Sequence, residues 1–387
     1  MSDDLLITGI GAIVSGDLTA PILAGDSVLC RDGLIAAVGR LDDVHPGGTP
    51  RTIDANGTTL VPGLIDAHTH PVLGDYTPRQ NTSGWIESYV HGGVTTLVSC
   101  GEPHTPGRPR DAAGVKALAI LAHKSFATVR PLGAKVHAGA LLLEPGLTEE
   151  DFAEAAAEGC WLLGEIGISS VSDPAAAVPL VEAAKRHGFL VPVHVGGASV
   201  PGSTVIGADM VVAVQPDVAV HCNGGPTAPS HDDVVRIIEE TDAAIEIVQA
   251  GNTRALRDVV RELMRRDLVD RLQIGSDTPS GTGVIPVGIL RTMAYASALA
   301  GLEPELAVCA ATGSTARRYR RNTGIIEPGR EADLVFLSTP RGSAAPTALE
   351  ALRAGDIPAV CGVIIDGVVR VTASRVTPPP SHAPSFG

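Results

Sequence analysis

The sequence lacks the features typical of membrane, secreted and nucleic-acid-binding proteins. No apolar run is long enough to span a bilayer, and the first residues, Met-Ser-Asp-Asp, lack the basic segment that opens a signal peptide. Acidic residues outnumber lysine and arginine by 43 to 29, which gives a net charge of -14. Such an acidic chain is a poor partner for nucleic acid or an anionic membrane. We therefore expect a cytoplasmic protein.

Clustered cysteines are absent and lysine is scarce. The six cysteines are widely separated and form no CxxC pair, so we expect small buried residues rather than disulfides or zinc ligands. Cys222 stands beside a histidine of interest, which leaves a catalytic thiol as a minor alternative. The four lysines are Lys116, Lys124, Lys135 and Lys185.

Short strand patterns near both ends of the chain predict one small β domain. Residues 27–39 read as two apolar strands around an Asp32-Gly33 turn, where glycine accepts a positive φ. Residues 360–371 repeat this pattern around Asp366-Gly367. We expect the two ends to pair with each other.

Strand and helix patterns alternate between these ends, which predicts a parallel sheet covered by helices. The eight candidate strands are 60–66, 94–100, 134–143, 161–168, 190–194, 218–221, 243–248 and 272–277. Eight β/α units over about 250 residues have the size of a TIM barrel. An open doubly wound sheet is the alternative, but no glycine-rich dinucleotide fingerprint follows the first strand.

The predicted fold class is therefore α/β, a (β/α)8 TIM barrel with a small β-sandwich built from both termini. The predicted parts are a composite β domain (1–57 and 325–376), the barrel (58–324) and a disordered tail rich in proline and serine (377–387). Helices are expected after Thr148, after Asp173 and over 253–268, from their capping residues and apolar faces.

Side chains suited to metal binding occur at the ends of the predicted strands. His68 and His70 follow the first strand, and the two-residue period of an extended chain places both imidazoles on one side. Two such imidazoles can hold zinc, iron or nickel, although two unrelated surface histidines would give the same motif. The later candidates are Glu165, His194, His221 and Asp277. Because barrel enzymes take their catalytic residues from these strand ends, the six together predict a metal site.

This set resembles the amidohydrolase superfamily, whose members carry His-x-His after strand one, a bridging ligand on strand four, histidines after strands five and six, and an aspartate after strand eight. The resemblance covers nearly the whole chain, including the split β domain. In many members the bridge is a carbamylated lysine. The strand 161–168 contains no lysine, so Glu165 is the candidate bridge, and Lys135, one strand earlier, is the alternative.

Several stretches are similar to enamidases, which hydrolyse 6-oxo-1,4,5,6-tetrahydronicotinate. They are 74–80, 91–96, 106–114, 223–228 and 277–283. This similarity implies two divalent metal ions, zinc with iron as an option in one position, and a homo-oligomer, specifically a tetramer. His68, His70 and Asp277 would hold one ion, His194 and His221 the other, and Glu165 would bridge them.

The implied reaction is the opening of a small cyclic amide. Two metal ions lower the pKa of a shared water toward about 7, and the hydroxide attacks the lactam carbonyl. Asp277 would carry the proton to the departing nitrogen, and an enamide product would then lose ammonia. A carboxylated ring needs polar or cationic partners, and the candidates are Tyr76, Arg79, His104 and Arg108. Each of these could equally be exposed or lie at an oligomer interface.

Three other functions remain to be separated from this one. A mononuclear deaminase of the superfamily carries a glutamate three residues beyond the strand-five histidine, where this sequence has Gly197. A hydantoinase, a dihydroorotase or a cyclic-imide hydrolase would need the same metals and differ only in the pocket. A metal-free, non-enzymatic scaffold is disfavoured because all six ligands are present.

Overall fold

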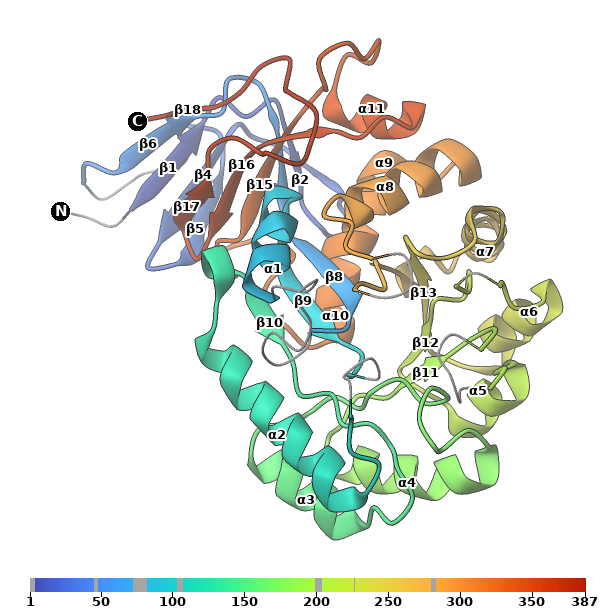
Figure 1. The fold of residues 1–387 in the computed structure, drawn as a ribbon. Helices are drawn as coiled ribbons and strands as arrows, with labels where there is room; N and C mark the ends of the chain where they lie inside the picture. The colour runs from blue at the N-terminus through green and yellow to red at the C-terminus, as the bar shows by residue number, and fades with distance from the viewer. Residues whose placement is uncertain are drawn as a thin grey trace.

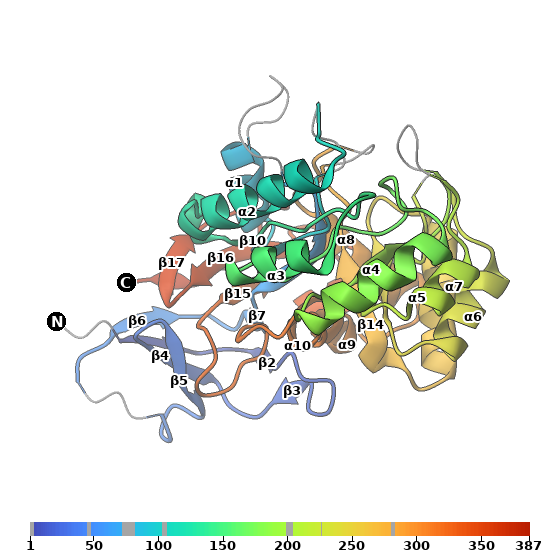
Figure 2. The same ribbon diagram turned by 90° about the horizontal axis from the view of Figure 1, so that it is seen from below.

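The computed structural model describes residues 4–44, 48–71, 82–102, 107–198, 204–225, 227–279 and 283–387. Both views place the strands contributed by the chain ends on one side of the molecule and helices α4 (Pro174–Arg186) to α7 (Thr253–Arg265) on the other (Figures 1 and 2). The first described strand, β1 (Leu5–Thr8), and the last, β18 (Ser385–Phe386), both lie on the strand-rich side (Figure 1). Within the described ranges, no helix combines the length and apolar character needed to cross a membrane.

Two sheets combine strands from the beginning and the end of the chain. The first has the order β18 (Ser385–Phe386), β6 (Arg51–Asp54), β1 (Leu5–Thr8), β4 (Ser27–Arg31) and β5 (Leu34–Gly39). The second has the order β17 (Val368–Val371), β16 (Ala359–Ile365), β15 (Leu334–Ser338), β7 (Thr59–Pro62), β2 (Ala12–Val14) and β3 (Ile22–Leu23). The predicted pairing of the two chain ends is therefore present.

The two predicted hairpin turns are also present. Strands β4 and β5 pair antiparallel around Asp32-Gly33, and β16 and β17 pair around Asp366-Gly367. Asp32 and Asp366 both have a positive φ, as does the glycine that follows each of them, so these turns use the left-handed region that Asp and Gly tolerate best. One buried apolar cluster joins the two sheets, with Ile7 and Val28 from the first and Leu60, Phe336 and Ile364 from the second.

The prediction of a disordered tail over 377–387 does not match the structure. Ser385 and Phe386 pair antiparallel with Asp54 and Ile53 of β6, and the Phe386 ring lies edge-on to Phe336, with centroids 6.1 Å apart. The prolines and serines misled the prediction because composition reports the lack of a regular pattern, whereas the tail gains its order from backbone pairing with a strand far away in the sequence.

The middle of the chain forms parallel strands. One sheet contains β8 (Leu64–Thr69), β9 (Val94–Ser99) and β10 (Lys135–His137), and the other contains β11 (Pro192–His194), β12 (Val218–Val220), β13 (Ala244–Val248) and β14 (Leu272–Gly275). Isolated parallel bridges connect the two sheets through Leu141–Leu163, Leu162–Leu190 and Ile166–Val193, and Thr69–Thr278 links β8 to the segment after β14. The fold is therefore α/β, and a closed barrel remains a prediction.

Three predicted strands differ clearly from the observed ones, and of these the segment 134–143 forms a strand only at β10. The segment 60–66 is interrupted at Gly63, so β7 joins the sheet of the chain ends and β8 joins the parallel strands. A Cβ at Gly63 would lie 2.1 Å from Oγ1 of Thr95, so the crossing between the two sheets needs glycine. The segment 161–168 has only isolated bridges instead of a continuous ladder.

Helices separate the parallel strands, and the three that the sequence predicts begin at Glu149, Pro174 and Thr253, as expected. The helices that follow β8 to β14 and precede β15 are α1 (Thr82–His91), α2 (Ala112–Thr128), α3 (Glu149–Ala157), α4, α5 (Ala208–Val214), α6 (His231–Glu240), α7, α8 (Gly288–Tyr295), α9 (Pro304–Cys309) and α10 (Thr315–Arg318). Helix α11 (Ala348–Ala354) lies between β15 and β16. The Asp151 side chain accepts a hydrogen bond from the Thr148 backbone N–H at the start of α3, and Asp173 accepts one from Ala176 at the start of α4.

Candidate metal centre

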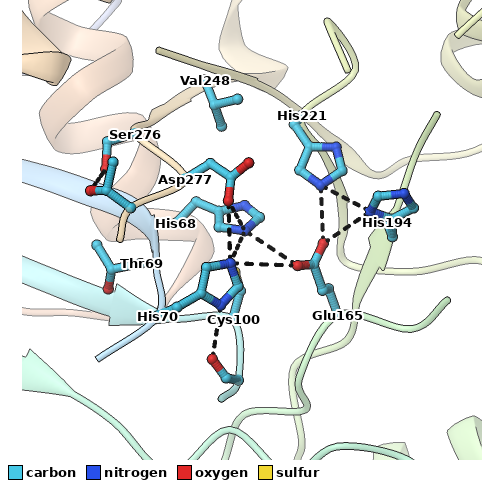
Figure 3. A network of polar contacts seen from close by, with 12 residues as sticks. His68, Thr69, His70, Cys100, Glu165, His194, His221, Val248, Ser276 and Asp277 are labelled. Carbon is cyan, nitrogen blue, oxygen red and sulfur yellow. Dashed lines mark hydrogen bonds and ion pairs between the residues drawn. The ribbon is translucent and has the colours of Figure 1, made fainter. Parts of the chain in front are cut away.

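Six side chains predicted from the strand ends meet in one buried cluster (Figure 3). They are His68 in β8, His70 just after it, Glu165 between two parallel bridges, His194 at the end of β11, His221 after β12 and Asp277 after β14. All except Asp277 are at least 96% buried, and the Asp277 side chain is 16% exposed. The prediction that these residues converge is borne out by their positions, whereas their roles as metal ligands remain a prediction.

Glu165 lies between two groups of side chains. Its Oε1 atom lies 3.6 Å from Nε2 of His68 and 3.6 Å from Nε2 of His70. Its Oε2 atom lies 3.0 Å from Nε2 of His221 and 3.4 Å from Nδ1 of His194. Each carboxylate oxygen therefore faces a different pair of imidazoles (Figure 3).

Asp277 completes the group that contains His68 and His70. Its Oδ1 atom lies 3.2 Å from Nε2 of His70 and 3.7 Å from Nε2 of His68. The Asp277 backbone N–H donates to the His68 carbonyl at 2.9 Å, so the backbone holds the two strand ends at this spacing. Asp277 has a φ of 58°, a left-handed conformation that aspartate tolerates better than most residues.

The outer nitrogen of each histidine has an oxygen partner. Nδ1 of His70 lies 2.8 Å from the Gly101 carbonyl, Nε2 of His194 lies 2.8 Å from the Gly197 carbonyl, and Nδ1 of His221 lies 3.0 Å from the Val195 carbonyl. Nδ1 of His68 lies 2.7 Å from Oε1 of Glu246. These oxygens accept the outer N–H, so in the neutral imidazole the lone pair is on the nitrogen that faces the cluster.

This arrangement fits metal ions. Nε2 of His68 and Nε2 of His70 are 3.2 Å apart, and Nδ1 of His194 and Nε2 of His221 are 3.1 Å apart. Two lone pairs at this separation repel each other unless a cation lies between them. Imidazole nitrogens together with carboxylate oxygens suit divalent transition-metal ions, so the donor set fits such ions.

The imidazoles of the cluster lower the pKa values of the two carboxylates, Glu165 and Asp277. When the ring nitrogens that face the two carboxylates carry protons, burial raises the pKa of Glu165, but the charge of His68 and hydrogen bonds from His194 and His221 outweigh this effect and hold the pKa well below its usual range. Burial likewise raises the pKa of Asp277, whereas the hydrogen bond from His70 and the charges of His68 and His221 lower it further than burial raises it. Both carboxylates are therefore ionised and available as ligands at neutral pH.

Lys135 lies away from this cluster. Its Nζ atom is 2.6 Å from Oε2 of Glu331, 2.7 Å from Oδ2 of Asp333 and 2.8 Å from Oδ1 of Asp366, all three in the region of the β15–β17 strands. The alternative of Lys135 as the bridging residue is thus wrong. Cys222 is fully buried, and burial together with the charge of Glu246 raises the pKa of its thiol, which disfavours a thiolate nucleophile.

Of the four candidate substrate contacts, only Arg108 lies within the described residues. Tyr76, Arg79 and His104 lie outside the described residues. The Arg108 side chain is 7% exposed, and its guanidinium donates from Nη1 to Oε1 of Glu144 at 2.6 Å and to the Pro109 carbonyl at 3.5 Å. A role for Arg108 in binding a substrate carboxylate remains a prediction, with one of its nitrogens already engaged.

Two buried carboxylates beside the cluster were missed by the sequence argument. Glu246 in the middle of β13 contacts His68, and Asp66 in β8 accepts hydrogen bonds from the backbone N–H groups of His68 and Ser276. Burial raises the pKa of Asp66 to about 7. The available signal was an acid within an apolar strand, since a buried charge is rarely found without a partner. Glu246 lies within its strand and Asp66 is not among the predicted ligands, although both border the cluster.

Residues 59–370 match the model of the amidohydrolase family, and the chain belongs to this family. It is 51% identical over 378 residues to an enamidase from Eubacterium barkeri, which covers 98% of each chain. A crystal structure of enamidase superposes with a TM-score of 0.96 at 50% identity and covers 99% of this chain and 100% of the other. The chain is therefore an enamidase homologue and a hydrolase of carbon–nitrogen bonds.

More distant relatives have lower sequence identity to this chain. An adenine deaminase from Ruegeria sp. (strain TM1040) is 27% identical over 335 residues, which cover 83% of this chain and 52% of that protein. A β-aspartyl dipeptidase from Fervidobacterium islandicum has a TM-score of 0.67 at 19% identity and covers 99% of this chain and 100% of the other. This second likeness shows the fold alone.

Proposed function

We propose that this chain opens a small cyclic amide at a centre of two divalent metal ions. The observation that carries the proposal is Glu165, whose two oxygens face two separate pairs of histidines. A single carboxylate shared by two imidazole pairs is the arrangement expected of a bridge between two cations. The similarity to enamidase supports the cyclic amide as substrate.

The proposed ligands divide into two sets. His68, His70 and Asp277 hold the first ion, and their ligand atoms lie within 4.8 Å of one another. His194 and His221 hold the second ion, and Glu165 bridges the two. The same spacing also groups His68 with Glu165 and His221, as expected where two sites share a carboxylate.

The residues of the chain then have distinct tasks in the reaction. When bound, two such ions lower the pKa of a shared water toward about 7 and polarise a carbonyl group. The Asp277 carboxylate, ionised because its pKa is lowered, accepts the proton of the attacking water and returns it to the departing ring nitrogen. The burial of the cluster excludes bulk solvent, which strengthens these electrostatic contacts.

The proposed substrate is a cyclic enamide such as 6-oxo-1,4,5,6-tetrahydronicotinate. Hydrolysis of the ring amide leaves an enamine, which can tautomerise and release ammonia on reaction with water. Tyr76, Arg79, His104 and Arg108 are the proposed contacts for a ring carboxylate. For Arg108 the support is its largely buried side chain after β9, which has three N–H donors on Nε and Nη2 besides the two of Nη1 directed at Glu144 and the Pro109 carbonyl.

We also propose the finer features of the fold. The parallel bridges from Leu141 to Leu163, from Leu162 to Leu190 and from Thr69 to Thr278 support closure of the parallel strands into a (β/α)8 barrel. The buried cluster shared by the two terminal sheets supports a β-sandwich. The proposed domains are a composite β domain of 1–57 and 325–376, with β7 added to it, and a barrel that begins at β8 and ends near residue 324.

The proposed metals are zinc, with iron as an option in one position, and the proposed assembly is a cytoplasmic homotetramer. The histidine-rich donor set supports zinc and iron. The tetramer and the compartment rest on the similarity to enamidase and on the acidic composition.

The test combines metal quantification with a substrate panel. We expect about two equivalents of metal per subunit by mass spectrometry, loss of activity after chelation and recovery on addition of Zn²⁺. The panel contains 6-oxo-1,4,5,6-tetrahydronicotinate, its saturated lactam, a hydantoin, dihydroorotate and succinimide, with ring opening and ammonia release measured separately. A subunit that holds less than one metal ion overturns the binuclear centre. Turnover of hydantoin or dihydroorotate without turnover of the enamide overturns the substrate and leaves the metals in place.

A further inference from the structure

Glu246 is a fully buried acid in an otherwise apolar strand. It is the third residue of β13, between Ile245 and Ile247, and none of its surface is exposed. Ala244, which shares its face of the strand, packs with Ile65 and other residues of the inward-facing cluster. Because burial of a carboxylate is costly unless it is hydrogen-bonded, its position needs an explanation.

The contacts of Glu246 connect the two halves of the cluster. Its Oε1 atom accepts from Nδ1 of His68 at 2.7 Å and from the backbone N–H of His221 at 3.2 Å. The Glu246 backbone carbonyl accepts from the Cys222 N–H at 2.7 Å. His68 and His221 belong to the two different imidazole pairs that face Glu165. One carboxylate oxygen is therefore a common acceptor for both halves.

Each contact constrains a different feature. The acceptor at Nδ1 keeps the His68 proton on the outer nitrogen, so Nε2 keeps its lone pair toward the cluster. The contact to His221 stabilises a turn in which this histidine has a φ of 37°, a conformation that a non-glycine residue rarely adopts. In this turn, Nε2 of His221 points toward Oε2 of Glu165.

We infer that Glu246 is a positioning residue for both metal ions, because one oxygen orients a ligand from each half. The inference rests on the proposed binuclear function. A purely structural Glu246 would stabilise the fold without changing metal affinity at constant folding. Gln273 provides the comparison, since it pairs with Glu246 across β13 and β14, is 1% exposed, and has no side-chain hydrogen-bond partner among the described residues.

The experiment compares the variants Glu246→Gln, Glu246→Ala and Gln273→Met with the parent protein. Metal content per subunit, the rate of zinc loss to a competing chelator, kcat and KM are measured, with circular dichroism as the check on folding. Glu246→Gln keeps an acceptor oxygen and loses the charge, so we expect about tenfold weaker zinc retention. Glu246→Ala removes the acceptor, so we expect about 100-fold weaker retention of both ions. In both, kcat falls more than KM changes, and Gln273→Met matches the parent.

The outcomes separate this inference from the proposed function. Parent protein that holds less than one metal equivalent per subunit overturns the binuclear function itself. Parent protein with two equivalents, together with Glu246 variants that retain zinc as well as the parent, overturns only the role of Glu246. Selective loss of one equivalent overturns the common role of the shared oxygen, and so does an equal loss in Gln273→Met. If Glu246→Ala does not fold, Glu246→Gln decides in the same way.

Discussion

His70 and Asp277 are 207 positions apart in the chain, and their side chains meet with Nε2 and Oδ1 only 3.2 Å apart. The backbone explains this contact. The Asp277 N–H donates to the His68 carbonyl, and the His70 N–H donates to the Thr278 carbonyl, each at 2.9 Å. The first and last parallel strands of the middle region are therefore neighbours, which brings a candidate ligand from each into one group.

The first prediction concerns Asp277. Substitution of Asp277 by Asn keeps the shape of the side chain but removes its charge and its capacity to accept a proton. We expect kcat/KM to fall by about 10³-fold, within the range typical of lost acid–base catalysis. Steady-state rates are to be normalised to metal content. A variant that retains a tenth or more of the parent rate would show that another group moves the proton.

The second prediction concerns Glu165. Substitution of Glu165 by Gln removes the negative charge between the two imidazole pairs. The repulsion between the two cations is then no longer offset by a carboxylate that both of them contact. We expect metal content to fall from about two equivalents to one or fewer, whereas Asp277→Asn keeps at least one. Glu150→Gln, on the exposed side of α3, serves as control and keeps both ions. Full metal content in Glu165→Gln would contradict the bridging role.

The candidate metal ligands were more predictable from the sequence than the residues that hold them in position. A strand end is visible as the point where an apolar run stops, so His68 and His194 could be assigned from local patterns. Glu246 could not be assigned in this way, because its partners His68 and His221 come from other strands. Its function depends on contacts that only the folded chain creates.

The limits of the fold prediction have a similar physical cause. Alternating strands and helices follow from local hydrophobic periodicity, which the sequence carries directly. The break at Gly63 and the strand β18 depend on long-range pairing, with Asp333 accepting from the Gly63 N–H and β6 pairing with the tail. Neither partner is near in the sequence, so local patterns merged one pair of strands and overlooked another strand.

The third prediction concerns the contact between Lys135 and the β15–β17 region. Nζ of Lys135 is surrounded by three carboxylates, and the Asp333 side chain is completely buried. Burial lowers the pKa of Lys135, but the charge and hydrogen bond of Asp333 and the other carboxylates raise it above its usual value, so the ammonium is retained. Lys135→Met leaves Asp333 buried without this cation, and we expect a loss of about 3 kcal/mol in unfolding free energy.

A matched control for Lys135 is Lys124→Met. Lys124 pairs with Glu158 at 2.6 Å, with both side chains at least half exposed, so its loss should cost less than about 1 kcal/mol. Urea unfolding of the two variants with their metal removed measures the difference. Equal stability of the two variants would mean that Asp333 is accommodated without Lys135.

The last prediction concerns pH and Glu262 on α7. Hydrogen bonds from Arg265 and, after the opposing effect of burial, from Arg266 lower the pKa of Glu262 from 4.5 to about 2. The two guanidinium groups each approach Oε1 at 2.6 Å, and Arg266 also contacts Glu239 of α6. Because the folded-state pKa lies below the unfolded one, the stabilisation is complete above pH 4.5 and is lost as the pH falls toward 2.

Glu262→Gln should therefore be less stable than the parent by about 1 kcal/mol at pH 7. The difference should shrink progressively between pH 4.5 and 2, because the parent carboxylate takes up a proton in that window and loses its charged contacts as well. Urea midpoints of the metal-free proteins across this range provide the measurement, and Glu150→Gln, which is exposed on α3, should follow the parent at every pH. A constant difference between Glu262→Gln and the parent from pH 7 to pH 2 would attribute the effect to packing on α7, since only a charged contact responds to protonation.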